Sequence, residues 1–168
     1  MCGAEVKPLS DSVRRVCTLL ETLEHPHLPI ALDDAAHTAQ QAADALGVSL
    51  GQIAKSIIFR LKPDDRAVLV VTSGDRRVDE HKVQALVCGA GQSLGRANAE
   101  FVKARTGFTI GGVSPLGHVE PPVVLLDEEL GRFDVIWAAA GHPNAVFKLT
   151  LTDLVAWTQA PVVDVTVR

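Results

Sequence analysis

Two features of this sequence have residue types that could do chemistry: Lys55, and the glycine-rich segment 111–117. Lys55 stands where a short helical segment gives way to the apolar run 56–61. Burying an ammonium group without a partner is costly, so a lysine at this place is either a functional cation or a side chain that reaches back to water. From its immediate neighbours alone, the second interpretation is favoured.

The segment 111–117 reads GGVSPLG. Glycines and a proline so close together predict a fixed loop whose backbone can approach a ligand closely. Several N–H groups of such a loop can converge on an anion or an oxyanion. The segment matches neither the GxxxxGK[ST] nor the GxGxxG phosphate-binding pattern. The alternative is an ordinary wide turn between two strands.

Other polar residues are weaker candidates. Ser114 is a potential nucleophile, but its neighbours do not form a GxSxG elbow and no partner base is evident. Asp75 and Asp127 follow apolar runs, where a carboxylate often only stabilises a turn. The histidines lack metal-ligand spacing, so we predict no metal and no other cofactor. The three cysteines show no CxxC spacing, which argues against a zinc cluster and a disulfide framework, and Cys17 is expected to be buried on a helix.

Composition and charge set the broad class. The chain has 168 residues, 47% of them hydrophobic and 21% charged, which predicts one globular domain over 1–168. No apolar run approaches the ~20 residues of a membrane helix, and residues 1–15 lack a secretory signal, so a cytoplasmic protein is expected. The net charge of −4 does not suggest a nucleic-acid binder, but residues 55–105 hold most of the basic side chains. That excess is either a small basic face for a few phosphates or a solvated surface.

Helix signals stand at both ends of the chain and strand signals dominate its centre. Ser10 or Asp11 can cap a first helix, and Thr38 with Gln41 forms a capping box before a helix that Gly47 ends. The following runs predict a β-hairpin over 55–73, helices near 79–87, 99–105 and 152–158, and further strands at 123–127, 134–140, 145–150 and 162–167. Several strands are joined by turns too short for a parallel crossover. We therefore expect an α/β fold of the α+β type, with a mixed, largely antiparallel sheet surrounded by helices.

The order of these motifs resembles the YbaK/ProX-type prolyl-tRNA editing family, which includes free-standing deacylases and a domain inserted in many bacterial prolyl-tRNA synthetases. The resemblance covers about residues 38–165. The stretches that carry it are AADALGVSLGQIAKSIIF, VLVVTSGDRRVDEHKV, TGFTIGGVSPLG, VVLLDEELGRFDVIWAAAG and LTLTDLVAWTQAPVVDV. The family's fold, a mixed sheet folded into a barrel-like body, agrees with the elements expected above.

The resemblance implies a set of site residues. The family's lysine motif falls on Lys55, with Ser56 where many relatives carry threonine, and its GxxxP loop falls on 111–115. The residues expected to be catalytic are Lys55, Gly111, Gly112, Ser114 and Pro115. Those expected to bind substrate are Ile57, Val113, Leu116, Gly117, Gly141 and His142, with Ala140 a further apolar pocket candidate.

The chemistry that the resemblance implies is hydrolysis of the ester between an amino acid and the terminal adenosine of tRNA. Lys55 would neutralise and orient an oxygen of the CCA end, while backbone N–H groups of 111–117 bind the carbonyl oxygen or hold the attacking water. The apolar pocket candidates favour a small residue such as alanine or cysteine on tRNA-Pro. A synthetase or an elongation factor is a plausible partner, with no membrane or DNA involved. Two alternatives stay open: a non-catalytic module of the same fold that binds tRNA or a synthetase, and a small-molecule hydrolase or structural α/β protein.

Overall fold

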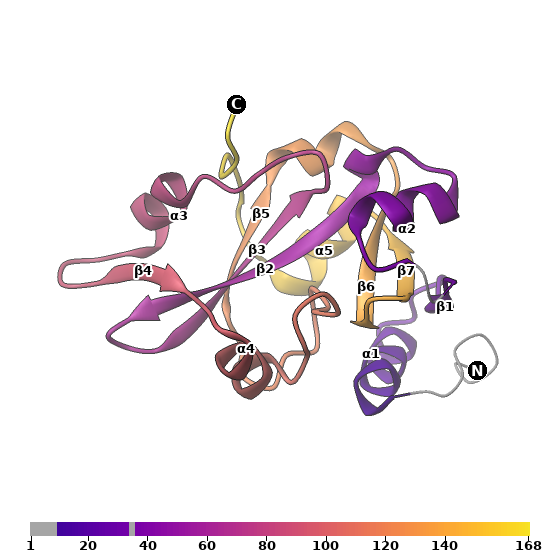
Figure 1. Cartoon of the computed structure of the whole chain (residues 1–168), viewed down its shortest axis with the longest axis horizontal. Coiled ribbons are helices and arrows are strands. Elements are labelled where there is room, and N and C mark those ends of the chain that lie inside the picture. Colours follow the sequence, from indigo (N-terminus) through magenta and orange to yellow (C-terminus); the bar gives the residue numbers. More distant parts are fainter. Residues whose placement is uncertain (1–9, 34–35) are drawn as a thin grey trace.

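The computed structural model describes residues 10–33 and 36–168, and Figure 1 shows the order of its elements. The helices are α1 (Asp11–Thr22), α2 (Ala39–Leu46), α3 (Glu80–Val87), α4 (Ala99–Thr106) and α5 (Leu151–Thr158), with 3-10 helices η1 (Leu50–Gln52) and η2 (Glu128–Arg132). The strands are β1 (Ile30–Ala31), β2 (Ile53–Lys62), β3 (Arg66–Ser73), β4 (Ser93–Arg96), β5 (Val123–Asp127), β6 (Ile136–His142), β7 (Ala145–Leu149) and β8 (Val162–Val163).

The strands form one mixed sheet in the order β1-β7-β6-β2-β3-β5-β8, and β4 pairs with the far half of β2. The hairpins β2–β3 and β6–β7 are antiparallel, as are β1–β7 and β2–β4. The contacts β2–β6, β3–β5 and β5–β8 are parallel. The expected mixed sheet of an α+β fold is therefore confirmed, and its order shows an open path of strands.

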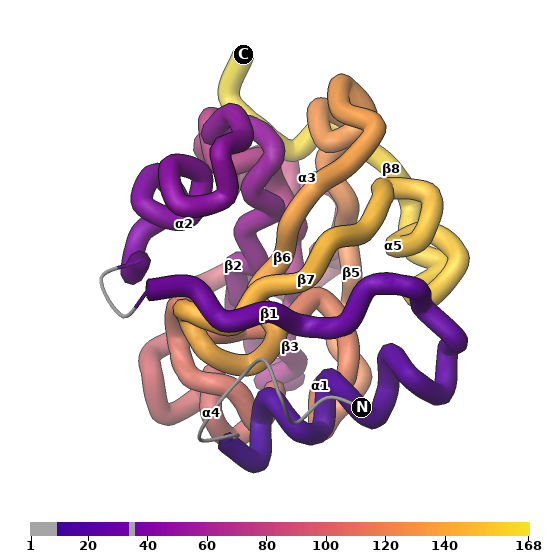
Figure 2. The backbone as a smooth tube through the Cα atoms, turned by 90° about the vertical axis from the view of Figure 1, so that its right-hand side faces the viewer, coloured from indigo at the N-terminus to yellow at the C-terminus, as the bar shows by residue number. Residues whose placement is uncertain are grey.

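Helices cover both faces of this sheet (Figures 1 and 2). On one face, α1, α4 and α5 pack through residues such as Val16, Phe101 and Leu154 against the main core. On the other face, Val83 of α3 joins a second cluster, and Ala42 and Ala43 of α2 pack on Ile53 at the start of β2. The long strand β2 thus runs through the middle of the molecule with packed layers on either side.

The capping signals in the sequence explain where the helices begin. Ser10 caps α1 by accepting the N–H of Val13, and Thr38 forms a capping box with Gln41 at α2. Gly47 ends α2 with φ of 70°, a left-handed conformation that glycine adopts without strain. The short strands β1 and β4 are absent from the sequence prediction, because runs of two and four residues carry no periodic signal.

The cysteines differ in part from expectation. Cys17 is buried on α1, as predicted, but it is disulfide-bonded, which the cysteine spacing did not indicate. Cys88 is a free, half-buried thiol.

Candidate functional site

A cavity of about 250 Å³ lies between α2, the first half of β2, the strands β6 and β7, and the glycine loop. Its walls are mostly small or apolar, and Lys55 is the only lysine or arginine among the described residues that line it. The lining residues are His37, Thr38, Ala39, Ala42, Ile53, Ala54, Lys55, Ser56, Ile57, Gly111, Val113, Trp137, Ala138, Ala139, Pro143 and Val146. The structure thus brings together Lys55, Ile57, Gly111 and Val113, which are distant in sequence.

The cavity opens against a gap in the pairing of β2. On one side, β3 pairs with β2 continuously from Ala54 to Leu61. On the other side, β6 pairs only with Ile53 and Ala54, and β4 only from Phe59 onward. Within the described strands, segment 55–58 therefore has one free edge, and alternate residues direct N–H and C=O groups to it. These backbone groups are available to a ligand in the cavity.

Lys55 is held at this edge by the turn that follows β3. Its side chain is half-buried, and Nζ donates a hydrogen bond of 3.0 Å to the carbonyl oxygen of Arg76. An ammonium group has three donors, so this bond leaves two for other acceptors. Burial lowers the pKa of Lys55 from its usual 10.5, and the negative charge of Asp75 opposes that shift. The lysine is a partly desolvated cation in a fixed position.

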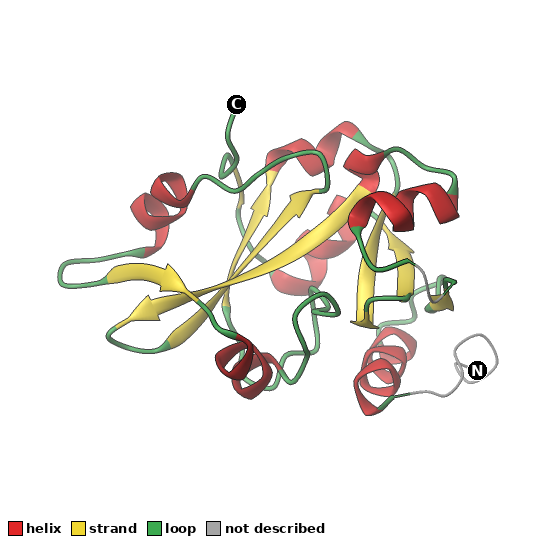
Figure 3. Cartoon of the chain, in the orientation of Figure 1, coloured by secondary structure: helices red, strands yellow, loops and turns green. Residues whose placement is uncertain are grey.

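The glycine loop reaches the cavity because glycines let backbone segments touch. Figure 3 shows the long loop between α4 and β5 in which it lies. A Cβ on Gly112 would lie 2.9 Å from Cα of His142, so only glycine fits there. Gly141 has φ of 100°, and its own Cβ would lie 2.7 Å from the carbonyl carbon of Ser12. The backbone of the glycine loop therefore packs directly against the end of β6, and the end of β6 packs directly against the start of α1.

Only some of the loop's N–H groups are available to a ligand. The N–H of Gly112 donates to the carbonyl of Thr109, and that of Leu116 donates to Oγ of Ser114. Within the described part of the chain, no hydrogen bond uses the N–H of Gly111 or Val113. Both of these residues line the cavity. Gly111 and Val113 are therefore loop residues that line the cavity and whose N–H groups have no partner among the described residues.

The other predicted loop residues lie away from the cavity. Ser114 is fully buried, and its hydroxyl accepts the N–H of Leu116. Its carbonyl accepts a bond of 2.6 Å from Nε2–H of His118, whose pKa is lowered by burial. Pro115 and Leu116 are buried too, and Gly117 lines a separate groove beside α1. This part of the loop forms a rigid support.

The turn 141–144 stands at the cavity mouth. Pro143 lines the cavity, and its ring lies 3.6 Å from the position of a Cβ on Gly111. His142 is exposed, and its Nδ1 accepts the N–H of Asn144. Among the described lining residues, His142, Gly141 and Ala140 do not occur. Their neighbour Pro143 lines the cavity, whereas the family resemblance led us to expect Gly141 and His142 there.

Several lining residues escaped the sequence prediction. Ala39 and Ala42 come from α2, Trp137 and Ala139 from β6, and Val146 from β7. The apolar alternation of a strand marks β6 as half-buried, but it does not tell which neighbour covers each face. A helix of small residues such as α2 indicates close packing, and only the fold shows what lies opposite.

Over residues 10–33 and 36–168, no group of three or more His, Cys, Asp or Glu side chains is arranged to hold a metal ion. None of the helices in those ranges combines the length and hydropathy needed to cross a bilayer.

A small, largely apolar cavity with one lysine and unpaired backbone N–H groups has room for a small apolar group and donors for an anion or oxyanion. Residues 33–156 match the model of the aminoacyl-tRNA editing domain. The chain belongs to this family of aminoacyl-tRNA editing domains.

Individual relatives agree with that assignment. The chain is 38% identical over 117 residues to the uncharacterized protein YwhH of Bacillus subtilis, covering 70% of this chain and 72% of YwhH. It is 31% identical over 115 residues to the proline–tRNA ligase of Lactobacillus acidophilus, covering 68% of this chain but only 20% of the ligase. A crystal structure of a proposed trans-editing enzyme for prolyl tRNA synthetase superposes with a TM-score of 0.87 at 40% identity, covering 95% of this chain and 99% of that one.

Proposed function

We propose that this protein is a trans-editing aminoacyl-tRNA deacylase that hydrolyses the ester of a mischarged tRNA, with tRNA-Pro carrying alanine, cysteine or a similar small residue as the substrate. The observation that carries the proposal is a cavity lined by Lys55 together with Gly111 and Val113, whose N–H groups have no hydrogen-bond partner among the described residues. The editing-domain family supports the substrate class. The similarity to a proline–tRNA ligase and to a proposed prolyl trans-editing enzyme supports the tRNA.

In the proposed reaction, water attacks the ester carbonyl carbon and the bond to the terminal ribose oxygen breaks. The ribose oxygen takes up a proton, and the products are a free amino acid and an uncharged tRNA. The ammonium of Lys55 binds an oxygen of the CCA end with the donors that Arg76 leaves free. The N–H groups of Gly111 and Val113 stabilise the negative charge that develops on the carbonyl oxygen. The ester is already activated, so positioning and charge stabilisation replace a strong protein base.

Cavity size and lining support a small aliphatic or thiol-bearing residue. A volume of about 250 Å³ lies below the range of pockets that hold drug-sized ligands. Side chains of Ala42, Ile57, Val113 and Trp137 offer apolar contacts and no carboxylate. The hydroxyl of Ser56 is buried in this wall and has no hydrogen-bond partner among the described residues. Because its substrate is charged tRNA, we place the protein in the cytoplasm, where a synthetase or an elongation factor would deliver that tRNA.

The test is release of free amino acid from a panel of Ala-, Cys-, Ser-, Thr- and Pro-tRNA-Pro, comparing the wild type with Lys55→Ala. We expect the wild type to deacylate the alanyl or cysteinyl substrate and to spare Pro-tRNA-Pro, and Lys55→Ala to lose most of that activity. Lys62→Ala is a matched control, since Lys62 is an exposed lysine at the far end of the same strand. Absence of release by the wild type on every substrate would reject the deacylase and favour a binding module.

A further inference from the structure

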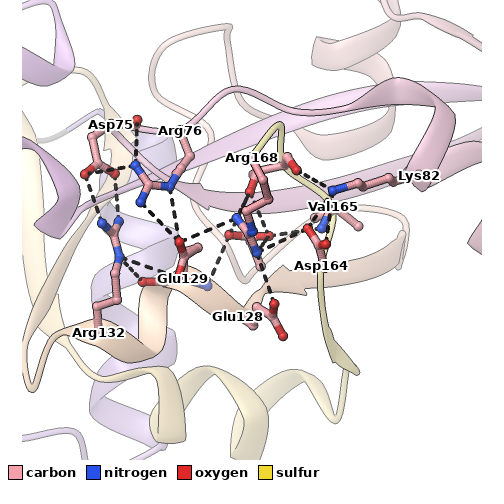
Figure 4. A network of polar contacts seen from close by, with 11 residues as sticks. Asp75, Arg76, Lys82, Glu128, Glu129, Arg132, Asp164, Val165 and Arg168 are labelled. Atoms are coloured by element: carbon pink, nitrogen blue, oxygen red, sulfur yellow. Dashed lines mark hydrogen bonds and ion pairs between the residues drawn. The ribbon is translucent and has the colours of Figure 1, made fainter.

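The turn that accepts the Lys55 hydrogen bond is held by hydrogen bonds and ion pairs between charged side chains, and Figure 4 shows this network. The turn runs over residues 73–76 and is closed by the N–H of Arg76 on the carbonyl of Ser73. Asp75 receives two bonds from Arg132 of η2, at 3.1 Å and 2.7 Å. Arg76 donates to the carboxylate of Glu129, also of η2, at 3.1 Å. Both ends of the short helix η2 thus hold the turn.

Close packing leaves this turn little freedom to shift. A Cβ on Gly74 would lie 2.5 Å from the carbonyl oxygen of Leu50 in η1, the segment that leads into β2. A Cβ on Gly51 would lie 2.6 Å from the ring of Phe133 and 2.9 Å from the carboxylate of Asp75. The guanidinium of Arg132 lies 4.8 Å from the centre of the same ring. The Asp75 carboxylate is therefore seated against η1 from one side and η2 from the other.

We propose that the Asp75–Arg132 pair is a positioning device for Lys55: it fixes the turn whose Arg76 carbonyl orients the lysine ammonium toward the cavity. This inference rests on the proposed function of Lys55 and deepens it. Neither Asp75 nor Arg132 lines the cavity among the described residues, so their effect on hydrolysis passes through Lys55. Bidentate geometry matters, because two parallel bonds fix an orientation that one bond leaves free.

The experiment compares Asp75→Asn and Arg132→Gln with Lys55→Ala in the deacylation assay. We expect each positioning variant to lower kcat by about ten- to a hundredfold, since a small misplacement of a catalytic group has effects of that order. KM should change little, because the cavity walls remain. Arg132→Lys keeps the charge but lacks the planar fork that forms two parallel bonds to a carboxylate, so it should recover part of the kcat lost in Arg132→Gln.

A second readout follows Lys55 without using activity. The rate at which an amine reagent modifies Lys55 is measured against exposed Lys62 of the same protein, at about pH 11.5, one unit above the ordinary lysine pKa of about 10.4, where lysines are largely neutral. In Asp75→Asn and Arg132→Gln, release of the turn should raise the limiting rate at Lys55 severalfold relative to Lys62. A role limited to stability would leave this ratio unchanged in the folded protein.

The matched control is Glu120→Gln. Glu120 and Arg105 form a comparable paired contact at 2.9 Å and 3.2 Å, and Arg105 also lies over an aromatic ring, that of Phe101. This variant should leave kcat and Lys55 reactivity as in the wild type. Retained kcat and unchanged Lys55 reactivity in both positioning variants, beside a loss in Lys55→Ala, would overturn the inference and spare the proposed function. If the wild type itself releases no amino acid, the proposed function fails, and the modification ratio still tests the positioning.

Discussion

Lys55 occupies a position that its neighbours in sequence do not explain. Its ammonium is bonded to the Arg76 carbonyl and partly desolvated, whereas the other interpretation of the sequence had it extending into water. Ser114 shows the opposite outcome, since a residue that resembled a nucleophile is buried with its hydroxyl bonded to a backbone N–H. At this scale, burial and hydrogen-bond partners separate a residue placed for chemistry from one that supports the loop.

Substitution of Ser114 tests that separation. Ser114→Ala should keep deacylation within about twofold and lower the free energy of unfolding by about 1–2 kcal/mol, because the buried N–H of Leu116 loses its acceptor. Steady-state kinetics and urea unfolding measure the two effects. A loss of activity by several orders of magnitude in a folded variant would return Ser114 to the role of nucleophile.

Among the elements, the glycine loop is fixed beside the cavity where three backbone segments meet with glycine between them. Gly112 lies against His142, and Gly141 lies against Ser12 at the start of α1. The helix α1 therefore packs against the end of β6, and the end of β6 packs against the loop that contains Gly111 and Val113. The short helix η2 plays a similar part for Lys55 through Arg132 and Glu129.

Gly141→Ala should be strongly destabilising. Its φ of 100° is unfavourable for alanine, and the new Cβ would meet backbone of Ser12 at 2.7 Å, so we expect a loss of at least about 2 kcal/mol. Gly47→Ala is the matched control, because Gly47 also has a positive φ but nothing lies within 4 Å of its Cβ position. Backbone strain alone should lower the unfolding free energy of Gly47→Ala by about 1 kcal/mol. If urea unfolding shows the same loss of unfolding free energy for Gly141→Ala and Gly47→Ala, the contact of Gly141 with α1 is unimportant.

The Asp75–Arg132 contact should make stability depend on pH. Hydrogen bonding and charge from Arg132 lower the pKa of Asp75 below its ordinary 3.8. A carboxylate whose pKa is lower in the folded state stabilises above the ordinary value, and that stability is lost as pH falls through the folded pKa. The wild type should therefore exceed Asp75→Asn in unfolding free energy at neutral pH, and the difference should vanish well below pH 3.8. A difference that persists at low pH would point to packing in place of charge.

For the whole molecule, ion pairs with carboxylates involve part of the basic charge that the sequence places in 55–105, namely Arg60, Arg76, Lys82 and Arg105. Over residues 10–33 and 36–168, seven basic side chains lie in ion pairs with carboxylates: Arg14, Arg60, Arg76, Lys82, Arg105, Arg132 and Arg168. With a net charge of −4, the surface has little positive potential for a long nucleic acid. This distribution fits a protein that grips only the end of a tRNA.

The salt dependence of deacylation tests whether the protein contacts only the acceptor end of the tRNA. If two or three phosphates are contacted, log kcat/KM should fall against log salt concentration with a slope of about −2 to −3. An acylated acceptor-stem minihelix should then be hydrolysed about as fast as full-length tRNA under the same conditions. A slope steeper than about −6, with poor activity on the minihelix, would indicate contacts far beyond the acceptor end.

The sequence by itself determined the elements with local signals. Capping residues such as Ser10 and Thr38 set helix starts, and the apolar runs of β2 and β3 set the central hairpin, because these effects act within a few residues. The motif order also indicated the family that the domain match confirms. The strands β1 and β4 were not predicted, since a pairing partner distant in sequence is what makes such short segments strands.

Only the tertiary structure decided how the site is assembled. Spacing along the chain placed Lys55 and the glycine loop as separate candidates, and the fold set them across one cavity with α2 and Trp137 as unforeseen walls. It also sorted the loop into Gly111 and Val113, which face the cavity, and Ser114 to Leu116, which are buried supports. The reason is physical: burial, free donors and the contacts of Asp75 with Arg132 depend on segments that are far apart in sequence and adjacent only after folding.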